Sequence, residues 1–273
     1  MGRPDSRAVA DSFHRRAADY DSHVLVQKRV AATLLSSLEA APAAAAATRI
    51  LDAGSGTGAL LPGIHARFPA SRLTAVDIAY NMCLHGRQKN GEYCGTVTGD
   101  IQQLPFKREV FDLVVSASAL QWVGDLKTAI HEMRRVLKPG GSLAVAFFCD
   151  GTLHQLQKCF RDAARLRGYP DSRLHSFWKR DELAGILEQL DFERYVITVE
   201  TETDWYDDLT SLLRSIKNIG AGATARGGGG LGWRGVLNDV SSLYKERYGE
   251  NGKIPASYQV LYLHASLPGV VTK

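Results

Sequence analysis

From residue 49 onward, short hydrophobic runs alternate with amphipathic stretches. The hydrophobic runs predict strands at 49–52, 72–77, 95–98, 111–116 and 142–148, and the stretches at 81–88 and 126–137 predict helices between them. Because strand and helix alternate, we expect an α/β fold with a mostly parallel sheet and helices on both faces. The Lys-Pro-Gly-Gly sequence at 138–141 predicts a turn that leads into the fifth strand.

The pattern changes on either side of this alternating region. Beyond it, helices are predicted at 153–166, 180–190, 209–216 and 235–248, and half-buried strands at 195–202 and 258–264. A run of four glycines at 227–230 separates the last two helices. Before it, Asp11 and Ser12 could cap a short helix, and Asp21 and Ser22 a longer one. The longer helix would present one apolar face, made by Val26, Val30, Leu34 and Leu38.

We expect a single domain over 1–273. It would comprise an N-terminal helical arm (1–47), a cofactor-binding core (48–150) and substrate-side helices with the remaining strands (151–273). Either the arm or the segment around 205–252 could lie over the carboxyl ends of the strands, where open α/β sheets bind ligands.

Composition narrows the function classes only a little. Of the 273 residues, 45% are hydrophobic and 23% charged, which is ordinary for a globular protein. No run approaches the roughly 18 apolar residues of a membrane span, and the first residues lack the apolar core of a signal peptide, so we expect a cytoplasmic protein. The four cysteines have no metal-type spacing, so free thiols and no metal are expected. The net charge of +4 is mild, and no basic-aromatic platform suggests nucleic acid.

The strongest candidate for chemistry is the stretch Asp52-Ala53-Gly54-Ser55-Gly56-Thr57-Gly58. Glycines without a Cβ allow a tight turn and a close approach to a ligand. With Ala59 and Asp77, the same loop also satisfies a dinucleotide-binding pattern. A carboxylate at Asp52 would repel a pyrophosphate, however, and would attract an ammonium group. We therefore favour S-adenosylmethionine, whose amino-acid end is cationic and which carries no phosphate.

Acids and small residues follow the later strands at the same edge. Asp77 could accept from both ribose hydroxyls, although a helix cap is the alternative. Asp100 could accept from an adenine amino group, with Ile101 against the ring, or could be a simple turn acid. The small residues that begin at Ser116 leave room for a ligand, and Gln121 and Trp122 could face the reacting groups. Core packing is the alternative for Trp122.

Together these segments, with Leu104-Pro105-Phe106 and the stretch from Arg135 to Gly141, resemble the class I S-adenosylmethionine-dependent methyltransferases. More narrowly, the chain is similar to the malonyl-acyl-carrier-protein O-methyltransferases of biotin synthesis. That similarity covers nearly the whole chain and rests on four patches: Phe13 with 16–21 and Gln27, 116–122, 151–153 with Leu156, and 213–221 with Gly230-Leu231 and 252–258. His154-Gln155 departs from it, since an acid is more usual there, and the four-glycine run is unusually loose.

The resemblance implies a Rossmann-like sheet with an antiparallel last strand, and methylation of the free carboxylate of a malonyl group on acyl carrier protein. The cofactor contacts it implies are Asp52, Gly54, Ser55, Gly56, Gly58, Asp77, Ile78, Met82, Asp100, Ile101, Ser116 and Ala117. A carboxylate is already ionised at neutral pH, so no general base is needed. Groups that hold the carboxylate must not neutralise the attacking oxygen, because negative charge is lost as the ester forms. Neutral donors therefore suit the catalytic site, and the candidates are Tyr20, Gln27 and Gln121.

The partner would be an acidic carrier protein. Lys158, Arg161 and Arg165 fall on one face of a predicted helix and could dock it, although a solvated surface is the alternative. Other functions stay open at this point. They are a methyltransferase for a small soluble acid or quinone precursor, a nicotinamide-dependent dehydrogenase, and a non-catalytic module that keeps the pocket.

Overall fold

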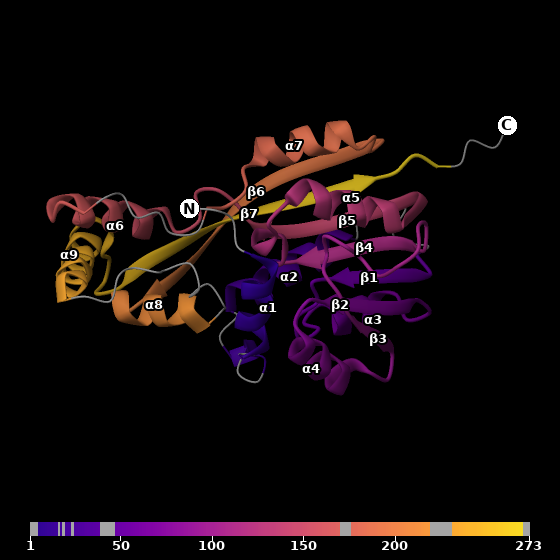
Figure 1. Ribbon diagram of the computed structural model, residues 1–273, viewed down its shortest axis with the longest axis horizontal. Coiled ribbons are helices and arrows are strands. Elements are labelled where there is room, and N and C mark those ends of the chain that lie inside the picture. Colours follow the sequence, from indigo (N-terminus) through magenta and orange to yellow (C-terminus); the bar gives the residue numbers. More distant parts are fainter. Residues whose placement is uncertain are drawn as a thin grey trace.

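The fold is built on one seven-stranded sheet with helices on both faces (Figure 1). It is seen in a computed structural model that describes residues 5–15, 17, 20–22, 25–38, 47–169, 176–218 and 231–269. The strands are β1 (Arg49–Ala53), β2 (Arg72–Asp77), β3 (Cys94–Thr98), β4 (Phe111–Ala117), β5 (Leu137–Phe148), β6 (Arg194–Tyr206) and β7 (Ile254–Ser266).

The strand order is β3-β2-β1-β4-β5-β7-β6. All pairs from β3 to β5 are parallel, whereas β7 runs antiparallel to both β5 and β6. The expected mostly parallel sheet with an antiparallel last strand is therefore confirmed. The chain reverses its direction of winding between β1 and β4, and ligands bind outside the carboxyl ends of the strands at such a point.

Helices cover the two faces of this sheet. They are α2 (Leu25–Ser37), α3 (Leu61–Arg67), α4 (Tyr80–Asn90), α5 (Leu126–Val136) and α7 (Arg180–Gln189). One apolar core, under α2 and α3, includes Leu34 and Ile64, and the other, under α5 and α7, includes Met133 and Leu187. Val26, Val30, Leu34 and Leu38 are all buried, as their spacing predicts.

Two further groups of helices flank the carboxyl ends of the strands (Figure 1). The N-terminal arm contains α1 (Ser6–His14), the 3-10 turn η1 (Tyr20–Ser22) and α2. The second group, which we call the outer lobe, consists of α6 (His154–Leu166), α8 (Leu209–Asn218) and α9 (Leu231–Tyr248). A 3-10 turn, η4 (Leu120–Trp122), follows β4. Within the described segments, no helix has both the length and the apolar character needed to cross a membrane.

Three local predictions were wrong. Asp11 and Ser12 lie inside α1, which begins at Ser6, and Asp21 and Ser22 belong to a separate 3-10 turn before α2 begins at Leu25. The 138–141 segment lies within β5, because the register between β4 and β5 shifts there and Gly140, at a φ of 74°, absorbs the irregularity. Helix α3 was not predicted because Pro62 and Gly63 weaken its signal, yet a proline is tolerated in a first helical turn.

The departure at 154–155 has a structural explanation. Gln155 is buried, and its side chain exchanges hydrogen bonds with Ser257: Nε2 donates to Oγ at 2.6 Å, and Oε1 accepts from the backbone N–H at 3.3 Å. A carboxylate could not make the first of these bonds as a donor. His154 and His131 are exposed, as expected, while His175 and the 227–230 glycines lie outside the described residues.

Candidate functional site

A cavity of about 970 Å³, including its open mouth, lies at the carboxyl ends of β1, β2 and β4. Volumes of this order are typical of small-molecule and cofactor sites. Its lining comes from two sources, the loops that follow the core strands and the N-terminal arm. None of the described residues after Val123 lines it, so the arm, and no described part of the segment around 205–252, borders the cavity.

The glycine loop after β1 forms the base of the cavity. Gly54, Gly56 and Gly58 all have positive φ values, of 74°, 55° and 83°, which L-residues with side chains rarely adopt. A Cβ on Gly54 would lie 2.4 Å from the Cβ of Ala119, while one on Gly56 would meet nothing within 4 Å. The N–H groups of Gly54 and Ser55 both donate to the Val76 carbonyl, at 2.7 and 3.0 Å, which ties the loop to β2.

Asp52 is buried at the start of this loop, with 1% of its surface exposed. Among the described residues, neither of its carboxylate oxygens has a hydrogen-bond partner. Burial, together with the nearby charge of Asp77, raises the pKa of Asp52 to about 8. A buried carboxylate without a partner is costly, so this geometry favours a cationic ligand that would supply the missing partner.

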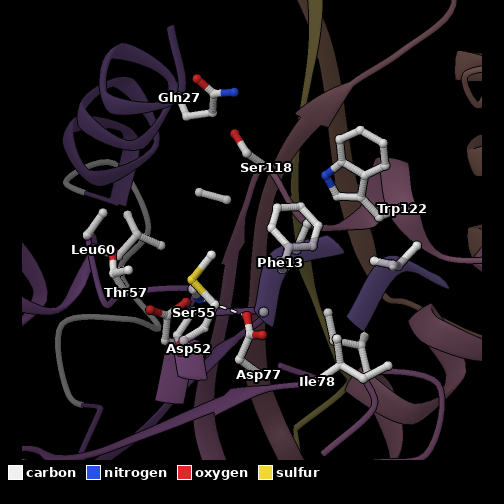
Figure 2. Close-up of a pocket in the computed structure, with 18 of the residues that line it drawn as sticks. Phe13, Gln27, Asp52, Ser55, Thr57, Leu60, Asp77, Ile78, Ser118 and Trp122 are labelled. Atoms are coloured by element: carbon white, nitrogen blue, oxygen red, sulfur yellow. Dashed lines mark hydrogen bonds between the residues drawn. The ribbon is translucent and has the colours of Figure 1, made fainter. Parts of the chain in front are cut away.

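Asp77, at the end of β2, accepts two backbone hydrogen bonds. Oδ2 accepts from the Gly56 N–H (Figure 2) and Oδ1 from the Ala79 N–H, both at 2.8 Å. Burial raises its pKa, and these two bonds oppose that shift. Each oxygen keeps a further lone pair, so the carboxylate can hold the loop and also accept from ligand hydroxyls. The two readings of Asp77, as a cap and as a ribose acceptor, are compatible.

The loop after β3 forms a third part of the lining. Asp100 and Ile101 both line the cavity, as predicted. The Asp100 carboxylate accepts from the Gln102 backbone N–H at 2.8 Å, which also fits the turn role that the sequence left open. Gln102 then donates to the Ser6 hydroxyl at 3.0 Å and so connects this loop to the arm.

Aromatic side chains form the wall on the arm side. The Phe13 ring makes edge contacts with Tyr20 and Trp122, with centroid distances of 5.9 and 5.8 Å. Burial and the charges of Asp77 and Asp21 raise the pKa of Tyr20, so its hydroxyl stays protonated and can donate a hydrogen bond. Gln27, from α2, also lines the cavity. Two of the three predicted catalytic residues therefore reach the site, and Trp122 faces the cavity in addition to packing.

Asp21 fastens the arm to the glycine loop. Its carboxylate accepts from the Thr57 hydroxyl at 2.5 Å and forms an ion pair with Lys89 on α4. These partners hold the pKa of Asp21 below its ordinary value despite partial burial. Asp21 is thus a structural contact between two walls of the cavity. Asp19 lies outside the described residues.

Three predicted site residues lie outside the lining. Gly58 faces the Asn90 side chain, 2.5 Å from where its Cβ would lie, so it closes the loop against α4. Ser116 is fully buried behind the cavity. Gln121 is also buried, and its Nε2 donates to the Ser118 carbonyl at 2.7 Å, so its side chain supports the loop after β4. We therefore no longer expect Gln121 to touch a substrate.

The remaining predicted cofactor residues line the cavity together. These are Asp52, Gly54, Ser55, Gly56, Asp77, Ile78, Met82, Asp100, Ile101 and Ala117. Some lining residues were not among the predicted cofactor contacts: Thr57 and Leu60, which lie beside those glycines, and Ser118, which lies in the 116–122 segment that carries the resemblance.

Comparisons with known proteins agree with this geometry. Residues 51–145, which contain the glycine loop and the core strands, match the family described as "Methyltransferase domain". Over 263 residues the chain is 41% identical to the malonyl-[acyl-carrier protein] O-methyltransferase of Geobacter sulfurreducens, covering 94% of this chain and 97% of that protein. It is also 34% identical to the protein of that name from a Methylovorus species, covering 97% of this chain and 90% of that one.

This chain belongs to the malonyl-[acyl-carrier protein] O-methyltransferase family. The solved structures that it resembles include a putative methyltransferase from Bacillus halodurans. That match has a TM-score of 0.61 and 17% identity, and it covers 87% of this chain and 99% of the other. It therefore supports the methyltransferase fold alone, while the relatives above establish the family and the enzyme class.

The cavity fits a cationic nucleoside cofactor better than a dinucleotide. The unpartnered Asp52 carboxylate needs a positive group, and the open space beside Gly56 admits a ligand close to the backbone. A pyrophosphate would bring only acceptors and negative charge to these two buried carboxyl groups, and it could not supply the positive partner that Asp52 lacks. The described residues contain no cluster of side chains suited to a metal ion.

Proposed function

We propose that this protein transfers a methyl group from S-adenosylmethionine to the free carboxylate of a malonyl group on acyl carrier protein, an early step of biotin synthesis. The observation that carries the proposal is the 41% identity to a protein of that name over 94% of the chain. Because the match extends beyond the cofactor core, it includes the arm and the outer lobe, the parts that would meet the substrate.

Three groups of residues would hold the cofactor. Asp52 would pair with the ammonium group, Asp77 would accept from the ribose hydroxyls, and Ile101 would lie against the adenine ring, close to Asp100. Bound in this way, S-adenosylmethionine supplies a methyl group activated on a sulfonium sulfur. The Phe13 and Trp122 rings, which close the arm side of the cavity, would exclude water.

Transfer would form a carbon–oxygen bond to the malonyl carboxylate as the methyl–sulfur bond breaks. The electron pair of the broken bond would stay on sulfur. No proton moves, so the protein has to align the reactants and keep the attacking oxygen free. Alignment of this kind contributes about 7–11 kcal/mol when two reactants are held near attack geometry. The Tyr20 hydroxyl and the Gln27 amide are neutral donors that could orient the carboxylate without neutralising it.

The test of this function is methyl transfer from labelled cofactor to three acceptors: malonyl carrier protein, malonyl coenzyme A and free malonate. We expect base-labile label on the carrier-bound malonyl group, because the product is an ester. Label on free malonate alone would favour the small-acid alternative. Label on none of the three would reject the proposal.

We further propose that the exposed ridge of α6 docks the carrier. Lys158, Arg161 and Arg165 lie along one face of α6, and all three are exposed. The ridge therefore offers positive charge to an acidic partner and would steer its encounter electrostatically.

Charge reversal tests this docking surface. The K158E/R161E variant should raise the KM for malonyl carrier protein about tenfold at low salt, and the difference should shrink at high salt. The matched control reverses the charges of Lys107 and Arg108. Both are exposed in the loop before β4, so they lie at the amino ends of the strands and not at the carboxyl ends. Equal effects of the two reversals, or a salt-independent KM, would reject the α6 ridge as the docking site.

A further inference from the structure

Ser118, in the loop after β4, is held in an unusual conformation at the wall of the cavity. Its φ is 58°, in the left-handed region that residues with side chains seldom adopt. Its Oγ is buried and has no hydrogen-bond partner among the described residues. Both features carry a cost in stability, and such strain concentrates at ligand sites.

The backbone around Ser118 is fixed from two directions. Its N–H donates to the Ala146 carbonyl of β5 at 2.7 Å, and its own carbonyl accepts from the buried Gln121 amide at 2.7 Å. The peptide units on both sides are therefore held, which fixes the direction in which the Cα–Cβ bond of Ser118 points. Figure 2 shows the hydroxyl directed into the cavity, towards the end where Gln27 lies.

The cavity has two chemically different ends. Asp52 and Asp77 make one end acidic, which suits the cationic and hydroxyl groups of the cofactor (Figure 2). Ser118 and Gln27 lie away from those acids and carry neutral hydrogen-bonding groups, and the ammonium group of Lys28, which also lines the cavity, donates to the Asp21 carbonyl at 2.8 Å. A carboxylate brought to the acidic end would be repelled, so the neutral end is the part of the cavity that suits an anionic substrate.

We propose that the Ser118 hydroxyl binds the substrate carboxylate directly, from the side of the cavity opposite the two acids. A carboxylate only accepts hydrogen bonds, so the hydroxyl would donate to one of its oxygens and leave the other free to attack the methyl group. A single neutral donor orients the anion while removing little of the charge that the reaction uses. This assignment rests on the proposed carboxyl methylation and adds a residue that recognises the carboxylate.

The test compares two carriers in the presence of S-adenosylhomocysteine, so that binding is measured without turnover. The wild-type protein should bind malonyl carrier protein more tightly than acetyl carrier protein, which lacks the carboxylate. In the S118A variant this preference should fall about tenfold, because a hydrogen bond to a charged group is lost. The affinity for S-adenosylhomocysteine should not change, and in turnover the KM should rise more than kcat falls.

S116A is the matched control. Ser116 also carries a buried hydroxyl without a described partner, two residues earlier on β4, but it does not line the cavity. We expect S116A to keep the wild-type preference for the malonyl carrier. S118G is a second variant, since glycine adopts the left-handed conformation without strain and equally lacks the hydroxyl. It should lose the preference as S118A does, even if S118A folds poorly.

The outcomes separate this proposal from the proposed function. If the wild-type protein prefers the malonyl carrier and both Ser118 variants keep that preference, Ser118 does not bind the carboxylate, and the methylation proposal stands. If S118A weakens S-adenosylhomocysteine instead, Ser118 belongs to the cofactor site and our assignment is wrong. If the wild-type protein neither prefers nor methylates the malonyl carrier, the function itself fails and takes the assignment with it.

Discussion

The two walls of the cavity are held together by different kinds of interaction. The sheet wall consists of loops anchored by backbone hydrogen bonds, such as those from Gly54 and Ser55 to the Val76 carbonyl. On the arm side, α2 packs into the main core, whereas α1 and η1 are joined to the sheet wall mainly by side chains, which include the bonds from Thr57 to Asp21 and from Gln102 to Ser6. A small apolar cluster of Ala17, Ala79 and Met82, with Phe13 and Tyr20, adds to that joint.

This difference separates two tasks. Loops anchored to a parallel sheet keep their geometry when a ligand leaves, which suits the cofactor end. A wall attached through a few side chains can be displaced at modest cost, which suits the side through which a substrate enters. We therefore expect substitutions in the sheet wall to affect cofactor binding strongly, and those in the arm to affect it weakly.

The largest effect is expected at Asp77. In D77N, a carboxylate that holds the glycine loop and would accept from the ribose is replaced by an amide, so the affinity for S-adenosylhomocysteine should fall about 100-fold. Titration calorimetry measures this change. D112N is a matched control, since Asp112 also accepts two backbone N–H groups, from Thr48 and Arg49, but outside the cavity. Equal losses of affinity in the two variants would mean that Asp77 acts only through stability.

An intermediate effect is expected from releasing the arm. T57V removes the hydroxyl that donates to Asp21, and D21A removes both that bond and the ion pair with Lys89. Each should weaken S-adenosylhomocysteine about fivefold and speed hydrogen exchange in α1, while exchange in β1 and β4 stays unchanged. Faster exchange throughout the sheet would show that the arm and the core unfold together, and the contrast between the two walls would be lost.

The same contact predicts a dependence on pH. The pKa of Asp21 is lowered in the folded protein, so its stabilising contribution is complete above the unfolded pKa near 3.8 and is lost as the pH falls through the folded value. The protection of α1 against exchange, relative to the intrinsic exchange rate at each pH, should therefore fall at acidic pH in the wild-type protein. In D21A the difference between α1 and the core should not grow as the pH falls.

The smallest effect is expected where α2 meets the edge of the sheet. Arg29 bonds to Glu202 and Asp204 on β6, both at 2.7 Å, but 42% of its side-chain surface is exposed. Solvent screening limits such pairs, so R29Q should lower the free energy of unfolding by less than about 1 kcal/mol. Urea unfolding at low and high salt measures this, and the difference should shrink with salt. A larger, salt-independent loss would mean that Arg29 acts through packing.

The contrast between the walls also explains how much the sequence could predict. Asp52, the glycines and Asp77 are local in the chain, and their spacing alone indicates where the loop and the next strand end. Hydrophobic runs likewise located the core strands, because buried parallel strands are continuously apolar. The ends of β6 and β7 were missed, since both strands extend beyond the predicted 195–202 and 258–264 into segments that are partly polar.

Long-range side-chain contacts could not be predicted in this way. Thr57 and Asp21 are 36 residues apart, and only the folded chain brings them together. Gln121 and Ser118 show the same limit within one short loop. The sequence suggested that Gln121 faces the reacting groups, but the left-handed conformation of Ser118 places the hydroxyl in the cavity and directs the amide to a backbone carbonyl.

The central claim is that Asp52 receives the cationic end of the cofactor, and its protonation tests that claim. Its pKa is about 8 in the folded protein, against about 4 for an unfolded aspartate, so the uptake of a proton on folding makes stability fall as the pH rises between these values. The isosteric D52N variant should flatten that fall. An ammonium group beside Asp52 should lower its pKa and expel the proton.

The most direct measurement is therefore the number of protons released when S-adenosylhomocysteine binds at pH 7, obtained from calorimetry in buffers of different ionisation enthalpy. We predict the release of about one proton per site for the wild-type protein and close to none for D52N, which should also bind more weakly. Binding with the same proton release in both proteins would contradict the account.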